Sequence, residues 1–169
     1  TVWAMYTKQN GLSSLMEAQG DSGAYIDSCY NGWAVIGSKR FGKLSKELQV
    51  TKLPIERAGP IRFGGGAAAP VKAATLRVRI GTIVGEGLLV VVRGHLPLLL
   101  GTKAIAEFDL LVGGKTSCVS QKSTPLSNYV AGEMPLVELC DPEKDPQGRP
   151  GSQAYLTVGE DGTETDVDD

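Results

Sequence analysis

The chain has 169 residues, a formal net charge of −2 and a hydrophobic content of 41%. This length is typical of one domain with additional segments, and the near-neutral charge argues against a nucleic-acid-binding protein, which normally carries a clustered basic surface. The longest apolar run, Leu88 to Val92, is the length of a strand, far below the roughly 18 residues of a membrane-spanning helix.

The three cysteines, Cys29, Cys118 and Cys140, are odd in number and lack Cys-x-x-Cys spacing. Neither a zinc site nor a disulfide framework is therefore expected, and we predict no metal and no cofactor. The first residue is Thr1, as expected of a processed product or of a fragment, and a protein that has lost an organelle-targeting peptide would begin in the same way. We expect an intracellular location, with an organelle among the open alternatives.

Two strands joined by a loop are predicted near the start of the chain. Residues 1–22 show no firm period and are interpreted as an N-terminal arm. Ala24 to Ile26 leads into Asp27, and Trp33 to Ile36 follows a turn at Asn31-Gly32.

A short helix and a glycine-rich segment come next. Ser38 can cap a helix whose apolar side chains at positions 41, 44 and 48 share one face. Ile61 to Phe63 then begins a segment that runs into Gly64, Gly65 and Gly66.

Strict alternation marks the clearest strand in the sequence. Leu76, Val78 and Ile80 point to one side between polar residues. A turn is predicted at Gly85 to Gly87. It leads into Leu88 to Val92, which is apolar on both faces and is therefore expected in the centre of a sheet.

A buried strand, a second helix and a hairpin complete the patterned region. Leu96 to Gly101 precedes a short helix over 103–108 that Thr102 can cap. Two strands around a Gly113-Gly114 turn are predicted to form a hairpin. The order of these elements is rich in strands and does not alternate βαβ, which disfavours a doubly wound nucleotide-binding fold.

Beyond Cys140 the character of the sequence changes. Prolines and glycines mark a linker, and residues 160–169 hold six carboxylates and no basic side chain. Such a run repels itself and is expected to stay solvated, with binding to a basic partner as the alternative.

Four stretches, in order, resemble the retropepsin-like aspartic peptidases, especially those of copia-type retrotransposons. Ile26-Asp27-Ser28, followed by Val35-Ile36-Gly37, is similar to the family's D-[ST]-G-A and V-V-G motifs. Ile61 to Gly66 is similar to the flap, and the predicted strand pair follows it. Leu96 to Gly101, with its helix and Asp109-Leu110, is similar to the family's PLLLG segment.

The resemblance implies a mostly-β, single-lobe acid-protease fold, a closed β-barrel with one or two short helices. The domain would span 23–140, after the arm at 1–22 and before a Pro/Gly-rich linker and acidic C-terminal tail at 141–169. The implied catalytic residues are Asp27 and Ser28, and Gly64, Gly65 and Gly66 would form the flap over the substrate. Aspartic peptidases use two carboxylates that share a proton. One chain supplies one half of this pair, so the resemblance implies a homodimer.

The sequence departs from the family pattern beside the implied catalytic aspartate. Cys29 stands where the family has glycine, and its thiol would crowd an approach that glycine leaves open. The loop from Asp27 to Gly37 is also one residue longer than the pattern. Asp21 begins a closer match, D-S-G-A, but polar residues precede it where a buried strand should run. Asp21 is therefore the weaker alternative to Asp27.

Other residues that could take part in catalysis or ligand binding have simpler interpretations. His95 is the only histidine and is expected to be structural rather than part of a Ser-His-Asp arrangement. Gly64 to Gly66 could cradle phosphate, but no Lys-Ser/Thr follows. The bases on the predicted helix are expected to face solvent rather than RNA. Thr1 as an N-terminal nucleophile is disfavoured by the surrounding pattern.

Two functions are compatible with these observations. The favoured one, because of Cys29, is a degenerate, retrotransposon-derived pseudoenzyme. It would serve as a non-catalytic protein-binding or structural accessory subunit of a larger assembly. The alternative is an active homodimeric aspartic endopeptidase that uses Asp27 from each chain on a peptide substrate. Neither a nucleic-acid partner nor a transmembrane segment is predicted.

Overall fold

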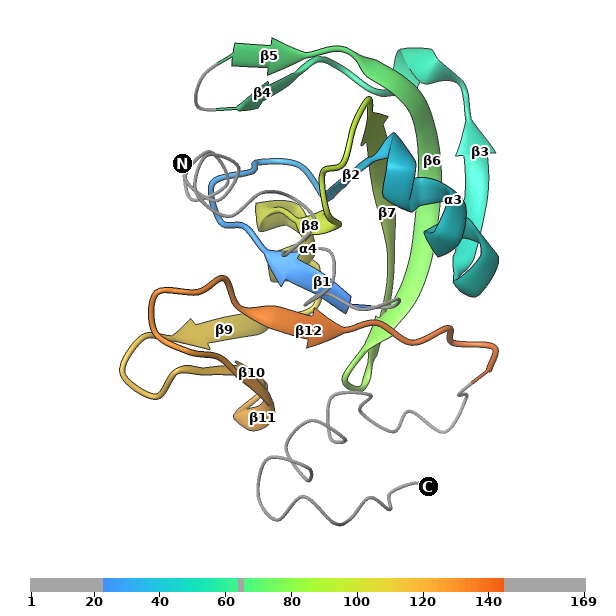
Figure 1. The fold of residues 1–169 in the computed structure, drawn as a ribbon. Helices are drawn as coiled ribbons and strands as arrows, with labels where there is room; N and C mark the ends of the chain where they lie inside the picture. Colours follow the sequence, from blue (N-terminus) through green and yellow to red (C-terminus); the bar gives the residue numbers. More distant parts are fainter. Residues whose placement is uncertain (1–22, 64–65, 145–169) are drawn as a thin grey trace.

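The computed structural model describes residues 23–63 and 66–144, which form a mostly-β structure with two short α-helices (Figure 1). The predicted N-terminal arm, Asp21, Gly64, Gly65 and the acidic segment lie outside the described residues. The first elements are β1 (Gly23–Ile26), β2 (Ala34–Gly37), α3 (Ser38–Glu47), β3 (Gln49–Leu53), the 3-10 helix η1 (Ile55–Arg57), β4 (Ile61–Phe63) and β5 (Gly66–Ala68). They are followed by β6 (Pro70–Ile80), β7 (Ile83–Val92), β8 (Leu99–Leu100), α4 (Thr102–Glu107), β9 (Leu110–Gly113), β10 (Cys118–Gln121), β11 (Thr124–Asn128) and β12 (Leu136–Glu138).

Seven strands form the main sheet, in the order β12-β1-β8-β2-β7-β6-β3. The predicted central position of Leu88 to Val92 is confirmed, because β7 lies between β2, which runs parallel to it, and β6, which runs antiparallel. The alternation in β6 is confirmed as well, since Leu76, Val78 and Ile80 are all buried. β1 runs parallel to β8, and this pairing brings the end of β1 beside the start of α4.

Closure into the expected barrel is not detected among the described strands of the main sheet. β12 and β3 are its two edges, and in the described ranges only one isolated bridge, between Arg79 of β6 and Cys140 beyond β12, links strands that are distant in this order. Two backbone hydrogen bonds of 2.8 and 2.9 Å make this bridge. The sheet therefore curls back on itself, but one bridge is not the continuous ladder that a closed barrel needs.

Both helices form where the sequence predicts them, but neither predicted cap is correct. Ser38 is the first residue of α3, after Gly37, and its hydroxyl accepts a hydrogen bond from the backbone N–H of Gly94. α4 begins at Thr102 instead of after it. The carbonyl groups of Tyr30 and Gly32 accept hydrogen bonds from the first N–H groups of α4, so a side-chain cap is not needed there.

The turn between β6 and β7 lies at Gly81-Thr82, and the predicted turn at Gly85 to Gly87 is wrong. Gly81 has a φ of 62°, which glycine adopts without strain. Gly85 and Gly87 lie inside β7 instead, where their missing side chains leave room for the rings of Phe108 and Trp33. These glycines therefore serve packing rather than chain reversal.

A smaller three-stranded sheet, β11-β10-β9, and the two-stranded β4-β5 hairpin complete the fold. The predicted hairpin after α4 is confirmed, but its turn covers 114–117 rather than Gly113-Gly114 alone. β3 and β11 were not predicted as strands. None of the helices described here has the length and apolar character needed to cross a membrane.

Candidate functional site

The loop after β1 is held by backbone hydrogen bonds from β8 and α4. The N–H of Asp27 donates to the carbonyl of Leu100 at 2.9 Å, and the N–H of Thr102 donates to the carbonyl of Tyr30 at 2.8 Å. The site loop (residues 27–32) therefore lies against the beginning of α4 (Figure 1).

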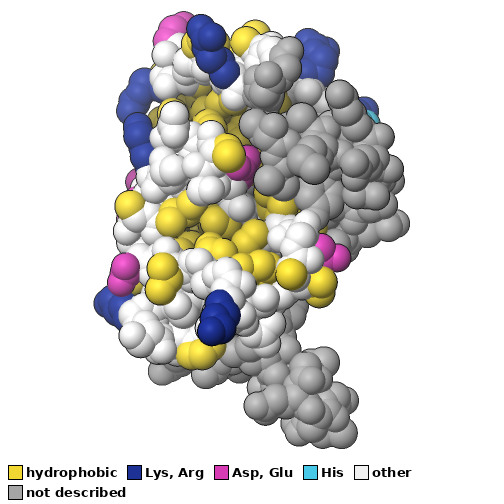
Figure 2. All heavy atoms as spheres, turned by 90° about the vertical axis from the view of Figure 1, so that its left-hand side faces the viewer, with side chains coloured by type: hydrophobic (Ala, Val, Ile, Leu, Met, Phe, Trp, Pro, Cys, Tyr) yellow, Lys and Arg dark blue, Asp and Glu magenta, His cyan; other side chains and the backbone are white. Residues whose placement is uncertain are grey.

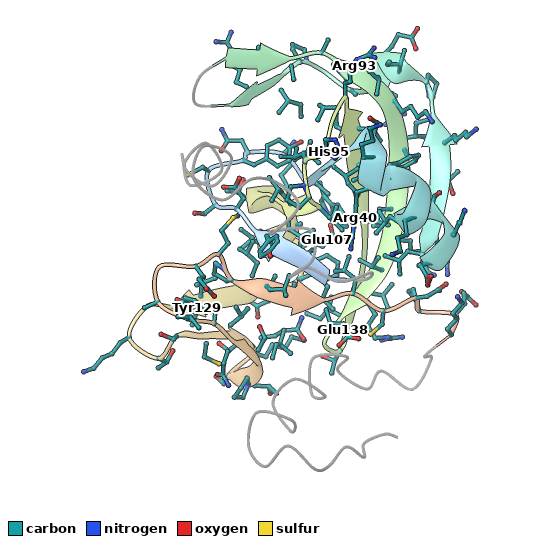
Figure 3. All side chains as sticks on the ribbon, in the orientation of Figure 1. Arg40, Arg93, His95, Glu107, Tyr129 and Glu138 are labelled. Carbon is teal, nitrogen blue, oxygen red and sulfur yellow. The ribbon has the colours of Figure 1, made fainter. Side chains whose placement is uncertain are left out.

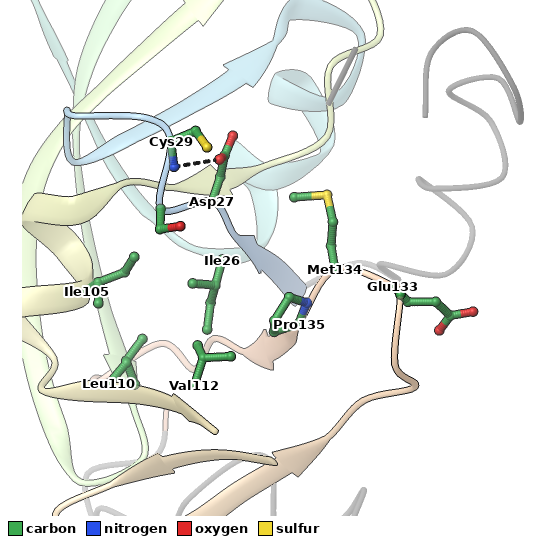
Figure 4. A pocket seen from close by; sticks show the side chains of 11 residues that line it. Ile26, Asp27, Cys29, Ile105, Leu110, Val112, Glu133, Met134 and Pro135 are labelled. Atoms are coloured by element: carbon green, nitrogen blue, oxygen red, sulfur yellow. Dashed lines mark hydrogen bonds between the residues drawn. The ribbon is translucent and has the colours of Figure 1, made fainter. Parts of the chain in front are cut away.

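The carboxylate of Asp27 is oriented by its own loop. Its Oδ1 accepts a hydrogen bond of 2.9 Å from the backbone N–H of Cys29, which is the geometry of an Asx turn (Figure 4). Asp27 is partly exposed, and both Ser28 and Cys29 are exposed. The thiol of Cys29 lies beside the carboxylate in Figure 4.

A cavity of about 510 Å³ opens at this loop, and we call it the apolar cavity. Most of its lining is hydrophobic, and the polar groups Asp27 and Ser28 stand at one side. It is lined by Ile26, Asp27, Ser28, Cys29, Ile105, Leu110, Val112, Gly132, Glu133, Met134 and Pro135 (Figure 4). Such a lining, apolar with few polar groups, is typical of a binding pocket.

A second cavity of about 440 Å³ lies on the other side of the site loop. It is bounded by residues 29–32 of the loop, by Gly59 to Arg62 at the base of the β4-β5 hairpin, and by Leu88 and Val90 of β7. Cys29 lines both cavities.

Tyr30 packs against glycines of the site loop and of the segment before α4. Its ring packs so closely over Gly32 and Gly101 that a methyl group on either glycine would overlap it. Burial raises the pKa of Tyr30 to about 12, because an ionised phenolate would lose its hydration. The phenol therefore stays protonated at neutral pH and cannot act as a base there.

Three apolar side chains on β9 and in the loop after β11 are exposed. Leu111 is 67% exposed and Val130 63% exposed, and Val112 extends from the cavity lining to the surface with 37% exposed. Figure 2 shows hydrophobic side chains gathered across the middle of the face on which β9 and the site loop lie.

The predicted site residues are only partly brought together. Asp27 and Ser28 line the apolar cavity, whereas Gly66, the described part of the predicted flap tip, begins β5 and lines neither cavity. His95 is exposed at the β7–β8 connection (Figure 3) and lines neither cavity. Over the described ranges no group of three or more His, Cys, Asp or Glu side chains could hold a metal ion.

Most of the apolar lining was not predicted from the sequence. Ile105, Leu110 and Val112 come from α4 and β9, and Met134 and Pro135 come from the loop before β12. The sequence shows that these residues are apolar, but apolar character predicts only that a side chain is buried, not that it lines this cavity. Nothing in a local pattern tells which distant segment they face.

No family model matches this sequence, and no curated protein matches it. Among solved structures, the chain is similar to the crystal structure of the retroviral protease-like domain of Ddi1 from Leishmania major. The TM-score is 0.40 and the sequence identity 11%, and the superposition covers 68% of this chain and 92% of that chain.

Proposed function

We propose that this chain contains a retropepsin-like domain that acts as a non-catalytic protein-binding subunit of a larger assembly. The observation that carries the proposal is the apolar cavity beside Asp27, whose lining residue Val112 is also exposed at the surface. The retropepsin-like part is supported by the order of elements. β1 leads into the Asp27 loop, a hairpin follows at β4-β5, and β8 leads directly into α4.

The carboxylates around the cavity argue against a complete catalytic pair within one chain. Aspartic peptidases need two carboxylates close enough to share a proton. Asp27 and Glu133 both line the apolar cavity, but the Glu133 side chain extends away from Asp27 (Figure 4). Among the described residues, the Asp27 carboxylate is paired with the backbone N–H of Cys29 rather than with a second carboxylate.

Cys29 argues against the passage of a peptide across the site loop. An extended substrate that reached from one cavity to the other would pass the side chain that lines both, and this side chain is a thiol rather than the hydrogen of glycine. A partner that occupies the apolar cavity alone does not meet this obstacle.

A protein partner fits this part of the surface better than a small ligand does, because apolar side chains are exposed on β9 beside the cavity lining. Exposed apolar side chains that gather on one face are typical of protein-binding surfaces. Leu111 and Val112 lie on β9, an edge strand of the three-stranded sheet, whose free backbone groups could also pair with a partner strand.

Peptide display tests the binding role. Peptides selected on the full chain should lose affinity for a Val112→Glu variant by at least about tenfold, or 1.4 kcal/mol, because the new carboxylate would have to be desolvated in the interface. Lys115→Glu places the same charge in the exposed β9–β10 turn and should leave binding unchanged. If the selection yields no binder, or if both variants bind as well as the parent, the binding role is wrong.

The alternative, an active homodimeric endopeptidase, is favoured by one observation: Asp27 is partly exposed, so a carboxylate from a second chain could approach it. A peptidase assay at mildly acidic pH separates the two functions. We expect the full chain to cleave no better than its Asp27→Asn variant. Cleavage that the substitution abolishes would establish the peptidase and overturn the non-catalytic proposal.

A further inference from the structure

Lysines on α3 line up along the outer side of the helix. Lys39, Lys43 and Lys46 are spaced four and three residues apart, so they share one side, and all three are exposed. Phe41 and Leu44 lie on the opposite side and are buried against the sheet. α3 therefore presents a row of positive charge to solvent.

Two further lysines lie on β3 and β6, beside Phe41 of α3. Lys52 of β3 and Lys72 of β6 are exposed, and both line a shallow hollow of about 250 Å³ that also touches Phe41 of α3. The Nζ of Lys72 lies 5.4 Å from the centroid of the Phe41 ring. We call the surface formed by Lys39, Lys43, Lys46, Lys52 and Lys72 the basic face.

Charge is divided unevenly along the chain. The described residues carry 15 basic and 10 acidic side chains, and the remaining residues carry 2 and 9, so the net charge of −2 separates into +5 and −7. Six of the nine acidic residues fall within 160–169. The sequence therefore holds a strongly acidic segment that complements the basic face.

The chain leaves the described structure next to the basic face. Asp141 accepts a hydrogen bond of 2.9 Å from the side-chain amide of Gln49, the first residue of β3, just beyond the end of α3. Glu143 lies 3.4 Å from Arg77 on the adjoining strand. About 15 residues separate Lys144 from the acidic segment, and such a length can span up to about 50 Å, whereas α3 is about 15 Å long.

We propose that residues 160–169 bind the basic face of the same chain. Single exposed ion pairs are weak, so the interaction depends on several carboxylates that meet several lysines at once. The covalent connection to Lys144 makes binding within one chain an intramolecular event, which raises the effective concentration of the segment at the basic face. The basic face is thus a docking surface for an acidic peptide.

Carbodiimide cross-linking of the full chain tests this proposal, because the reagent joins a carboxylate to a lysine amine only where the two are in contact. Mass spectrometry should find cross-links from 160–169 to lysines of the basic face. They should disappear in about 1 M salt, where the screening length falls to about 3 Å. The exposed lysines Lys103, Lys115 and Lys122, which lie outside the basic face, should give none.

Two full-chain variants and an isotope mixture make the test specific. In a variant with Lys39, Lys46, Lys52 and Lys72 changed to Gln, the acidic segment should be cleaved faster by proteases than in the parent chain. This measurement is needed because removing the lysines also removes the cross-linking sites. Changing Lys103, Lys115 and Lys122 to Gln should have no effect. Absence of cross-links, equal cross-linking to both sets of lysines, or cross-links formed mainly between ¹⁵N-labelled and unlabelled chains would overturn the proposal.

Discussion

At the scale of single residues, Gln121 joins three separate parts of the structure. Its side chain is buried and accepts a hydrogen bond of 3.0 Å from the backbone N–H of Thr82. It donates to the carbonyl groups of Ile80 and Phe108 at 2.9 and 2.8 Å. The β6–β7 turn, the end of α4 and β10 are therefore tied together by one amide.

Replacing Gln121 by Leu should lower the free energy of unfolding substantially. The substitution leaves one N–H and two carbonyl groups without their partner, at roughly 1–3 kcal/mol for each group that stays buried, so we expect a loss of about 3 kcal/mol. Urea unfolding measures this, with the exposed Asn128→Leu as the matched control. A loss no greater than that of the control would show that Gln121 does not hold these elements together.

At the scale of elements, two glycines in regular structure have opposite roles. Gly87 in β7 gives room to the indole of Trp33, whose Nε1 donates a hydrogen bond of 2.9 Å to Glu107 of α4. Gly42 in α3 has open space where a side chain would stand. Gly87 therefore allows β7 to pack against Trp33, whereas Gly42 lowers the stability of α3.

Alanine at these two glycines should change stability in opposite directions. Gly87→Ala should destabilise by roughly 1–3 kcal/mol, because a methyl group would overlap the Trp33 ring. Gly42→Ala should stabilise by about 0.5–1 kcal/mol through a lower backbone entropy of the unfolded chain. Chemical unfolding measures the free energy of unfolding of both variants. Changes of the same sign in the two would contradict this prediction.

At the scale of the whole molecule, the protection of backbone amides from hydrogen exchange is expected to vary strongly between the sheets. β7 is paired on both sides and buried along its second half. In the part of the chain that the structure describes, β4 and β5 pair only with each other, over three residue pairs. A two-stranded hairpin of this length is marginally stable, whereas a central strand opens only when the sheet does.

Hydrogen exchange followed residue by residue should therefore separate these strands. Amides of β7 should exchange slowest, with protection close to that of global unfolding, and the paired amides of β4 and β5 should exchange fastest among the strands. Comparable protection in the hairpin and in β7 would show that the hairpin is held by contacts other than its own ladder.

The clearest elements could be predicted from local patterns. Alternation indicated β6, a run apolar on both faces indicated the centre of the sheet at β7, and spacing of apolar residues indicated α3. β11 escaped prediction because Pro125 and its polar neighbours give it no alternation. The helix starts were misassigned because backbone carbonyl groups and Gly94, all distant in sequence, changed the role of Thr102 and Ser38.

The sequence by itself determined the buried faces of the most regular elements and where Asp27 follows a strand, because burial of apolar groups leaves a period in the local order of residues. The tertiary structure alone decided that the strands form a curled sheet joined by one bridge, and that segments from 105 to 135 complete the cavity at Asp27. The order of strands in a sheet and the contacts between its loops join residues far apart in the chain, and no local period records those contacts.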